Sequence, residues 1–111
     1  MHFYGTQAIN EHGHLTIGGV DTIELAKIYG TPLFVYDTAL IRKRARGFID
    51  TFNEYGVKAQ VAYASKAFAC IAAYQLAEQE NLSLDVVSGG ELYTAIKAGF
   101  PVDRIHFHGN N

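Results

Sequence analysis

Three short apolar runs alternate with two helical stretches between residues 57 and 108. The runs at 57–64, 82–87 and 105–108 predict strands, and the stretches at 67–80 and 88–98 predict helices. This order predicts right-handed βαβ units, and therefore an α/β fold whose parallel sheet is covered on both faces. A complete (β/α)8 barrel needs about 250 residues. The 111 residues therefore predict the front part of a larger barrel or of an open α/β sheet.

A helix is also predicted at residues 20–30, because its first residues follow the pattern of a capping box. Asp21 is the expected N-cap, and Glu24 follows it three residues later. Short strands are predicted on either side of this helix, at residues 14–17 and 32–36.

A longer helix is predicted at residues 39–55, with Asp37 or Thr38 as its N-cap. Its apolar residues recur at helical spacing, so they are expected to face a core. These residues are Ile41, Ala45, Phe48, Ile49 and Phe52.

Composition excludes several classes of partner. The formal net charge is -2, which gives no basic surface for nucleic acid, and no apolar run is long enough to span a bilayer. The N-terminus lacks the pattern of a signal peptide. The single cysteine, Cys70, cannot form an internal disulfide. These features predict a cytoplasmic protein with no nucleic-acid or membrane partner.

Lys66 lies among alanines, where the strand predicted at 57–64 runs into the next helix. Two interpretations are open. The side chain reaches solvent along its own stem, as most lysines do. Alternatively, the amine is held in a partly desolvated site, where its neutral form becomes a nucleophile. This stretch alone favours the solvent-exposed lysine.

Each predicted strand places a polar residue at its carboxyl end, where βα units carry their functional side chains. These residues are Lys66, Asp85 and His108. A carboxylate inside an apolar run is costly to bury without a partner, and Lys66 or a bound cation could pair with Asp85. The alternative is a purely structural ion pair between neighbouring strands, and the sequence leaves both open.

Two other patterns carry little weight. Gly89-Gly90 opens a helix whose free N–H groups could hold an anion, but it does not match a known nucleotide-binding motif, so a tight turn is favoured. The His-x-His pairs at 12–14 and 106–108 lack the further ligands that zinc needs. We therefore predict no metal site.

Three stretches carry a resemblance to a known family. They are Ala-Tyr-Ala-Ser-Lys-Ala at 62–67, Leu-Asp-Val-Val-Ser-Gly-Gly-Glu-Leu at 84–92, and Ile-His-Phe-His-Gly-Asn-Asn at 105–111. In them the chain resembles the diaminopimelate decarboxylases, pyridoxal-phosphate enzymes with an alanine-racemase-like barrel. The resemblance covers almost the whole chain. It implies that residues 20–111 form the first three βα units of a (β/α)8 TIM barrel, and that residues 1–19 belong to a second, β-rich domain.

The resemblance also implies roles for single residues. The lysine that matches Lys66 is catalytic and binds the cofactor, pyridoxal 5'-phosphate, covalently. Asp85 matches a carboxylate beside the cofactor, and Ala64 would pack near the cofactor ring. Glu91 and His108 align with walls of the cofactor pocket.

For the intact enzyme, the resemblance implies decarboxylation of meso-2,6-diaminopimelate, a small amino acid, to L-lysine and carbon dioxide by a homodimer. The family's phosphate-binding loop lies beyond residue 111. We therefore expect the 111 residues alone to be inactive and to self-associate through an exposed sheet edge. Two alternatives stay open: a related decarboxylase of the ornithine or arginine type, and a non-catalytic carrier of pyridoxal phosphate on the same barrel.

Overall fold

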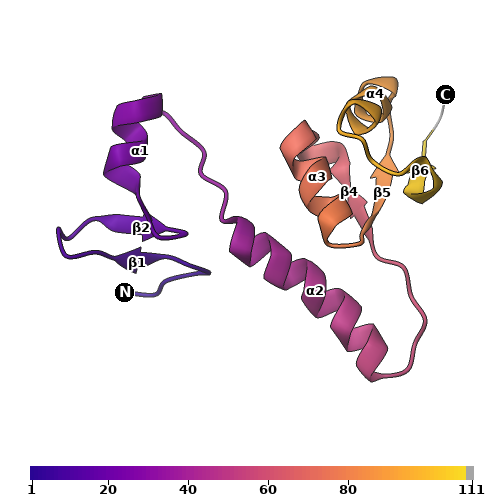
Figure 1. Ribbon diagram of the computed structural model, residues 1–111, viewed down its shortest axis with the longest axis horizontal. Coiled ribbons are helices and arrows are strands. Elements are labelled where there is room, and N and C mark those ends of the chain that lie inside the picture. The colour runs from indigo at the N-terminus through magenta and orange to yellow at the C-terminus, as the bar shows by residue number, and fades with distance from the viewer. Residues whose placement is uncertain (110–111) are drawn as a thin grey trace. The chain divides into compact units, whose positions relative to one another are not determined.

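The computed structural model describes residues 1–109. The chain divides into two compact units, Met1–Arg44 and Ala45–Asn111, and helix α2 (Thr38–Glu54) crosses the boundary between them (Figure 1). Asn110 and Asn111, which the sequence places in a C-terminal loop, lie outside the described residues. Each unit has its own three-stranded sheet.

The first unit contains a small antiparallel sheet followed by one helix. The sheet has the order β1-β2-β3, and its elements are β1 (Ala8–Ile9), β2 (Leu15–Ile17), β3 (Val20–Asp21) and then α1 (Thr22–Tyr29). The strand predicted at 14–17 and the helix predicted at 20–30 are therefore confirmed within one or two residues. The capping box is only half formed, because Glu24 accepts a hydrogen bond from Lys27 Nζ, at 2.8 Å, on the next turn of the helix.

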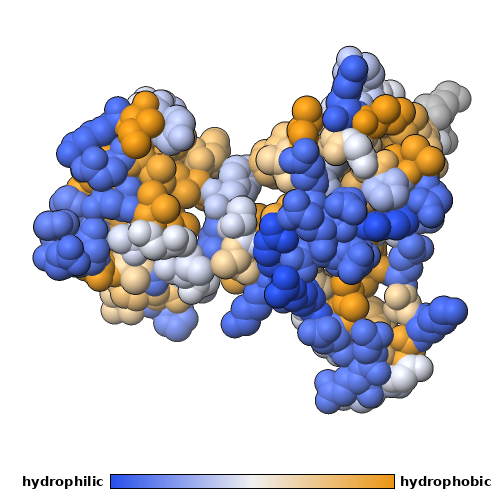
Figure 2. Space-filling view, in the orientation of Figure 1, coloured by the Kyte–Doolittle hydropathy of each residue, from blue (hydrophilic) through white to orange (hydrophobic). Residues whose placement is uncertain are grey.

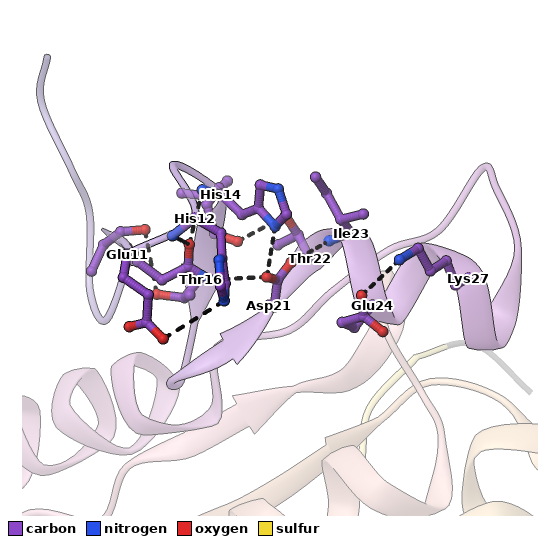
Figure 3. Close-up of polar contacts among 12 residues, drawn as sticks. Glu11, His12, His14, Thr16, Asp21, Thr22, Ile23, Glu24 and Lys27 are labelled. Carbon is purple, nitrogen blue, oxygen red and sulfur yellow. Dashed lines mark hydrogen bonds and ion pairs between the residues drawn. The ribbon is translucent and has the colours of Figure 1, made fainter.

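Asp21 joins the sheet of the first unit to helix α1 (Figure 3). One carboxylate oxygen accepts the Ile23 N–H at 2.8 Å, which confirms Asp21 as the N-cap. The other oxygen accepts from Asn10 Nδ2 at 2.9 Å and lies 2.8 Å from His14 Nδ1. The hydrogen bond with His14 is the main reason that the pKa of Asp21 falls to about 2, with Asn10 and Ile23 adding to the effect.

Asp37 is the N-cap of α2 and, like Asp21, also accepts hydrogen bonds from a distant part of the first unit. Its Oδ1 accepts the Leu40 N–H at 3.1 Å, and its Oδ2 accepts the Thr6 backbone N–H at 2.8 Å and the Thr6 hydroxyl at 2.7 Å. The bonds from Thr6 lower the pKa of Asp37. Gly5, at a φ of +56°, lies so close to Asp37 Oδ2 that a Cβ atom at that position would collide with it.

The second unit is built on a parallel sheet of order β4-β5-β6, which confirms the predicted α/β class. Its elements are β4 (Ala62–Ala64), a 3-10 turn (Ser65–Ala67), α3 (Ile71–Gln79), β5 (Ser83–Val86), α4 (Gly89–Lys97), a second 3-10 turn (Val102–Arg104) and β6 (Ile105–Phe107). The register pairs Ala64 with Asp85 and Asp85 with His106.

The core of the second unit lies on one face of this sheet. Leu84 and Val86 of β5 are fully buried, and α3 and α4 cover them. Buried residues of the cluster are Ala45, Tyr74, Ala77, Leu82, Leu84, Val86, Ala95 and Phe100. The side chains between these core residues point to the opposite face of the sheet, and on that face Ala62 and Ala64 of β4 are exposed.

Arg104 ties the strands of the second unit to helix α3. Its guanidinium donates to the Leu82 carbonyl from Nε at 3.2 Å and from Nη2 at 2.7 Å, and Nη2 also donates to the Glu78 carbonyl at 3.2 Å. The guanidinium carbon lies 5.3 Å from the centre of the Phe100 ring. One side chain thus links the residues that precede β5 and β6.

Several predicted element bounds differ from the structure. Residues 32–36 belong to no strand in the described part of the chain, the strand predicted at 57–64 is formed only at 62–64, and the helix predicted from residue 67 begins at Ile71. A strand needs a hydrogen-bonded neighbour, and apolar composition alone does not supply one. Phe68 and Cys70 have extended backbone angles, which separate the 3-10 turn from α3.

Many apolar side chains remain on the surface (Figure 2). In α2, Ala45 is buried and Ile49 packs on the core as predicted, whereas Ile41, Phe48 and Phe52 are exposed. None of the helices within residues 1–109 combines the length and the apolar character that a membrane span requires.

Candidate active site

The carboxyl edge of the parallel sheet gathers the residues that the sequence singles out. Ala64 ends β4, and Lys66 lies two residues beyond it. Asp85 is the third residue of β5 and pairs in register with Ala64. His108 follows β6 directly, and its backbone N–H donates to the Val86 carbonyl at 2.8 Å. Since the three strands are parallel, these residues lie at the same end of one sheet.

Asp85 has a different partner from the one considered in the sequence. Its Oδ2 lies 3.6 Å from His108 Nδ1, a distance for charge attraction when the imidazole is protonated but too long for a good hydrogen bond. The Asp85 side chain is 29% exposed and that of His108 is 77% exposed. Within residues 1–109, no ion pair joins Lys66 to Asp85. The pair that forms therefore joins neighbouring strands β5 and β6.

Lys66 is exposed and occupies the middle of the 3-10 turn. The turn is closed by the Phe68 N–H, which donates to the Ser65 carbonyl at 3.1 Å. The Tyr63 hydroxyl then donates to the Phe68 carbonyl at 2.6 Å, so β4 holds the far side of the turn as well. The backbone under Lys66 is therefore fixed, while its amine is accessible from solvent.

Ser65 anchors the turn from below. Its side chain is completely buried, and its hydroxyl lies 3.0 Å from the Asp85 carbonyl and 3.1 Å from Glu91 Oε1, with both oxygens as acceptors. The sequence alone does not single out Ser65. The available signal was a hydroxyl residue at the end of a run of alanines, where a buried polar group must find partners.

Glu91 lies in the first turn of α4. Its Oε2 accepts the Ser88 hydroxyl at 2.8 Å and the Val87 N–H at 3.1 Å. Ser88 Oγ in return accepts the Glu91 N–H at 3.2 Å, which confirms the predicted N-cap. The Ser88 hydrogen bond is the main reason that the pKa of Glu91 is lowered, with Val87 and Ser65 adding to it against the effect of burial.

The fully buried Tyr74 lies beneath the same region. Its hydroxyl forms no hydrogen bond of normal geometry with any residue from 1 to 109. Burial raises the pKa of Tyr74, against the effect of the neighbouring Ser65 side chain, which lowers it, and the charge of Glu91 adds to the rise.

The described residues contain no group of three or more His, Cys, Asp or Glu side chains that could hold a metal ion. His12 and His14 lie with ring centres 5.9 Å apart, and His14 is engaged with Asp21. The His14 imidazole therefore takes part in the hydrogen bonding of the first unit, through Asp21.

Comparison with known proteins gives a consistent group of relatives. Residues 38–111 match the family of pyridoxal-dependent decarboxylases, in its pyridoxal binding domain. The whole chain is 75% identical to a diaminopimelate decarboxylase of Bacillus methanolicus and 68% identical to one of Bacillus subtilis strain 168. It covers 26% and 25% of their lengths, so the chain spans about a quarter of these relatives.

Solved structures agree with these sequence matches. The crystal structure of diaminopimelate decarboxylase from M. jannaschii in complex with L-lysine is 39% identical, with a TM-score of 0.84. The match covers 96% of this chain and 25% of that one. The similarity therefore extends through both units of the chain.

Proposed function

Because the chain belongs to the pyridoxal-dependent decarboxylase family, we propose that the complete protein removes carbon dioxide from meso-2,6-diaminopimelate and releases L-lysine. The observation that carries this proposal is the 75% identity to a diaminopimelate decarboxylase over all 111 residues. The matched residues span the whole carboxyl edge of the parallel sheet. The L-lysine in the M. jannaschii complex has the chemistry of the proposed product.

The residues at this edge fit a pyridoxal phosphate site. Lys66 offers an exposed amine on a fixed turn, where an aldehyde can reach it. Ala62 and Ala64 are small, exposed and on the same sheet face as Asp85, so this face has room for a planar ring. We assign Lys66 as the residue that binds the cofactor covalently and that moves a proton during the reaction.

The other site residues would act around the amine. Asp85 would place a carboxylate beside the cofactor and Lys66. Ala64 would pack against the ring, and Glu91 and His108 would contribute to the wall of the pocket. When bound, pyridoxal phosphate supplies the electron sink that accepts the electron pair left by the departing carboxylate.

In the complete protein, residues 20–111 would form the first three βα units of a (β/α)8 barrel, and residues 1–19 would join a second, β-rich domain. The parallel sheet of the second unit and the TM-score of 0.84 support the barrel part of this proposal. The functional form would be a cytoplasmic homodimer that acts on a small amino acid. Since the chain spans only a quarter of its relatives, we expect it to be inactive by itself and to self-associate through the open edges of its sheet.

The test uses the full-length protein with pyridoxal phosphate. Carbon dioxide release is measured with meso-diaminopimelate, ornithine and arginine, and the expected result is turnover of diaminopimelate alone. Lys66→Ala should abolish turnover and the borohydride-stable cofactor adduct. Lys58→Ala, which changes another exposed lysine ahead of β4, should preserve both.

Each other result would point to a different protein. Turnover of ornithine or arginine in place of diaminopimelate would make this a related decarboxylase. A cofactor adduct at Lys66 without turnover of any substrate would make it a carrier. An adduct that persists in Lys66→Ala would refute the assignment of Lys66.

A further inference from the structure

We propose that Glu91 is a positioning residue, which sets the place of the Lys66 amine through the buried hydroxyl of Ser65. This inference deepens the proposed function and rests on it. Glu91 accepts a hydrogen bond from Ser65, which is the residue directly before Lys66 in the 3-10 turn. We call this contact the Ser65–Glu91 brace.

The brace acts on a turn whose far side is held by the Phe68 N–H and the Tyr63 hydroxyl. Ser65 is the only residue of the turn at 65–67 that is buried, because Lys66 and Ala67 are both exposed. Its hydroxyl has one hydrogen for two acceptors, the Asp85 carbonyl at 3.0 Å and Glu91 Oε1 at 3.1 Å. The charged oxygen is the stronger acceptor, so the carboxylate holds the hydroxyl in its observed orientation.

Glu91 can hold the turn because its own position is fixed from the other side. Oε2 is engaged by the Ser88 hydroxyl at 2.8 Å and by the Val87 N–H at 3.1 Å. Val87 directly follows β5, and Ser88 is the N-cap of α4. The Glu91 carboxylate therefore holds the turn at a fixed position relative to β5 and α4.

The same hydroxyl links the turn to the strand that carries Asp85. Ser65 Oγ lies 3.0 Å from the Asp85 carbonyl, and the Asp85 side chain projects from that same residue. The brace thus fixes the spacing between the backbone of Lys66 and the backbone of Asp85 without contact to either functional group.

This role differs in a measurable way from direct contact between Glu91 and the cofactor. If Glu91 acts through Ser65, Ser65→Ala and Glu91→Ala should have the same effect, and the double variant should add nothing. If Glu91 touches the cofactor, Ser65→Ala should be nearly silent and the two effects should add. Glu91→Gln keeps a carbonyl oxygen for Ser65 and should retain most of the positioning.

The experiment uses the full-length protein freed of cofactor. Pyridoxal phosphate is added, borohydride traps the adduct, and mass spectrometry gives the initial rate of labelling at Lys66, with labelling at Lys58 as the internal reference. Displacing a reacting group by about 1 Å can lower a rate on the order of 100-fold, so we expect about a tenfold or greater loss in Ser65→Ala and Glu91→Ala. Hydrogen exchange at the amides of residues 66–68 is measured in parallel and should accelerate in the same variants.

Thr94→Ala is the matched control. It removes the hydrogen bond from the Thr94 hydroxyl to the Gly90 carbonyl within α4, but it leaves Ser65, Ser88 and Glu91 in place. We expect it to weaken α4 while labelling at Lys66 and exchange at the turn stay near wild type. Labelling losses in Ser65→Ala and Glu91→Ala no greater than in Thr94→Ala would overturn the brace and leave the proposed function standing. Absence of selective Lys66 labelling in the wild-type protein would refute the proposed function, and the inference with it.

Discussion

Replacing Arg104 by methionine tests how much the guanidinium of this residue stabilises strands β5 and β6. Methionine keeps an apolar stem of similar length, so the change removes mainly the charged head. That head donates to the Leu82 and Glu78 carbonyls and lies over the Phe100 ring. The residue is partly exposed, so each contact counts near the lower end of its usual range.

The expected loss follows from these contacts. Hydrogen bonds to a charged group contribute about 1.5–3 kcal/mol, and two carbonyl partners at the lower limit give about 3 kcal/mol. An exposed cation–π contact adds about 0.5–1 kcal/mol. Allowing for water that replaces part of the lost bonding, Arg104→Met should reduce the local stability of β5 and β6 by about 2–4 kcal/mol.

Native-state hydrogen exchange on the full-length protein measures this loss, because it gives the opening free energy of single amides. The amides of Ser83–Val86 and Ile105–Phe107 should exchange faster, and those of α1 should not. Lys97→Met is the control: Lys97 lies 5.5 Å over the exposed Tyr93 ring, and its loss should cost only about 0.5 kcal/mol. An equal effect of both variants on β5 and β6 would refute the reasoning.

Two further predictions concern the first unit. The pKa of Asp21 is lowered from 3.8 to about 2, so its contribution to stability is complete above the unfolded value and is lost as the pH falls through the folded value. The protection of the amides of β2 and β3, relative to intrinsic exchange at each pH, should therefore fall between about pH 4 and pH 2 in the wild-type protein, and the same fall in Asp21→Asn would contradict this cause. Gly5→Ala should cost more than Gly18→Ala by about 1 kcal/mol or more, because both glycines have a positive φ but only at Gly5 would the methyl group collide with Asp37. Thermal unfolding of the two variants gives the comparison, and equal losses would show that the collision is relieved at no cost.

The sequence predicts best those features that depend on a few neighbouring residues. Asp21 and Ser88 are N-caps as expected, because a cap is a hydrogen bond within one helical turn. The order and direction of β4, β5 and β6 also follow from the spacing of apolar runs, because parallel strands require crossover helices of this length.

Features that depend on distant partners could not be predicted. The run at 32–36 is apolar enough for a strand, yet no described strand pairs with it. Phe48 and Phe52 follow helical spacing but remain exposed. A periodic pattern identifies the apolar face of a helix, but it does not identify the element that packs against that face. The partner of Asp85 is His108, which lies 23 positions later and reaches it only through the pairing of β5 with β6.

The candidate site residues are easier to find in the sequence than the residues that support them. Lys66 and Asp85 stand out because charged residues within apolar runs are unusual. Ser65 is chemically plain, and its importance comes from Glu91 in another helix. Only the folded chain shows that these two residues meet.

The alternation along β5 gives the core and the candidate site a common origin. Leu84 and Val86 point to the helices, while Asp85 between them points to the opposite side. Inserting or deleting one residue within this strand would exchange the two sets, burying the carboxylate in hydrocarbon and exposing the leucine. Such a register shift would disrupt both the hydrophobic core and the candidate site. Length changes in this protein should therefore be tolerated only in the connections, and β5 should vary by substitution alone.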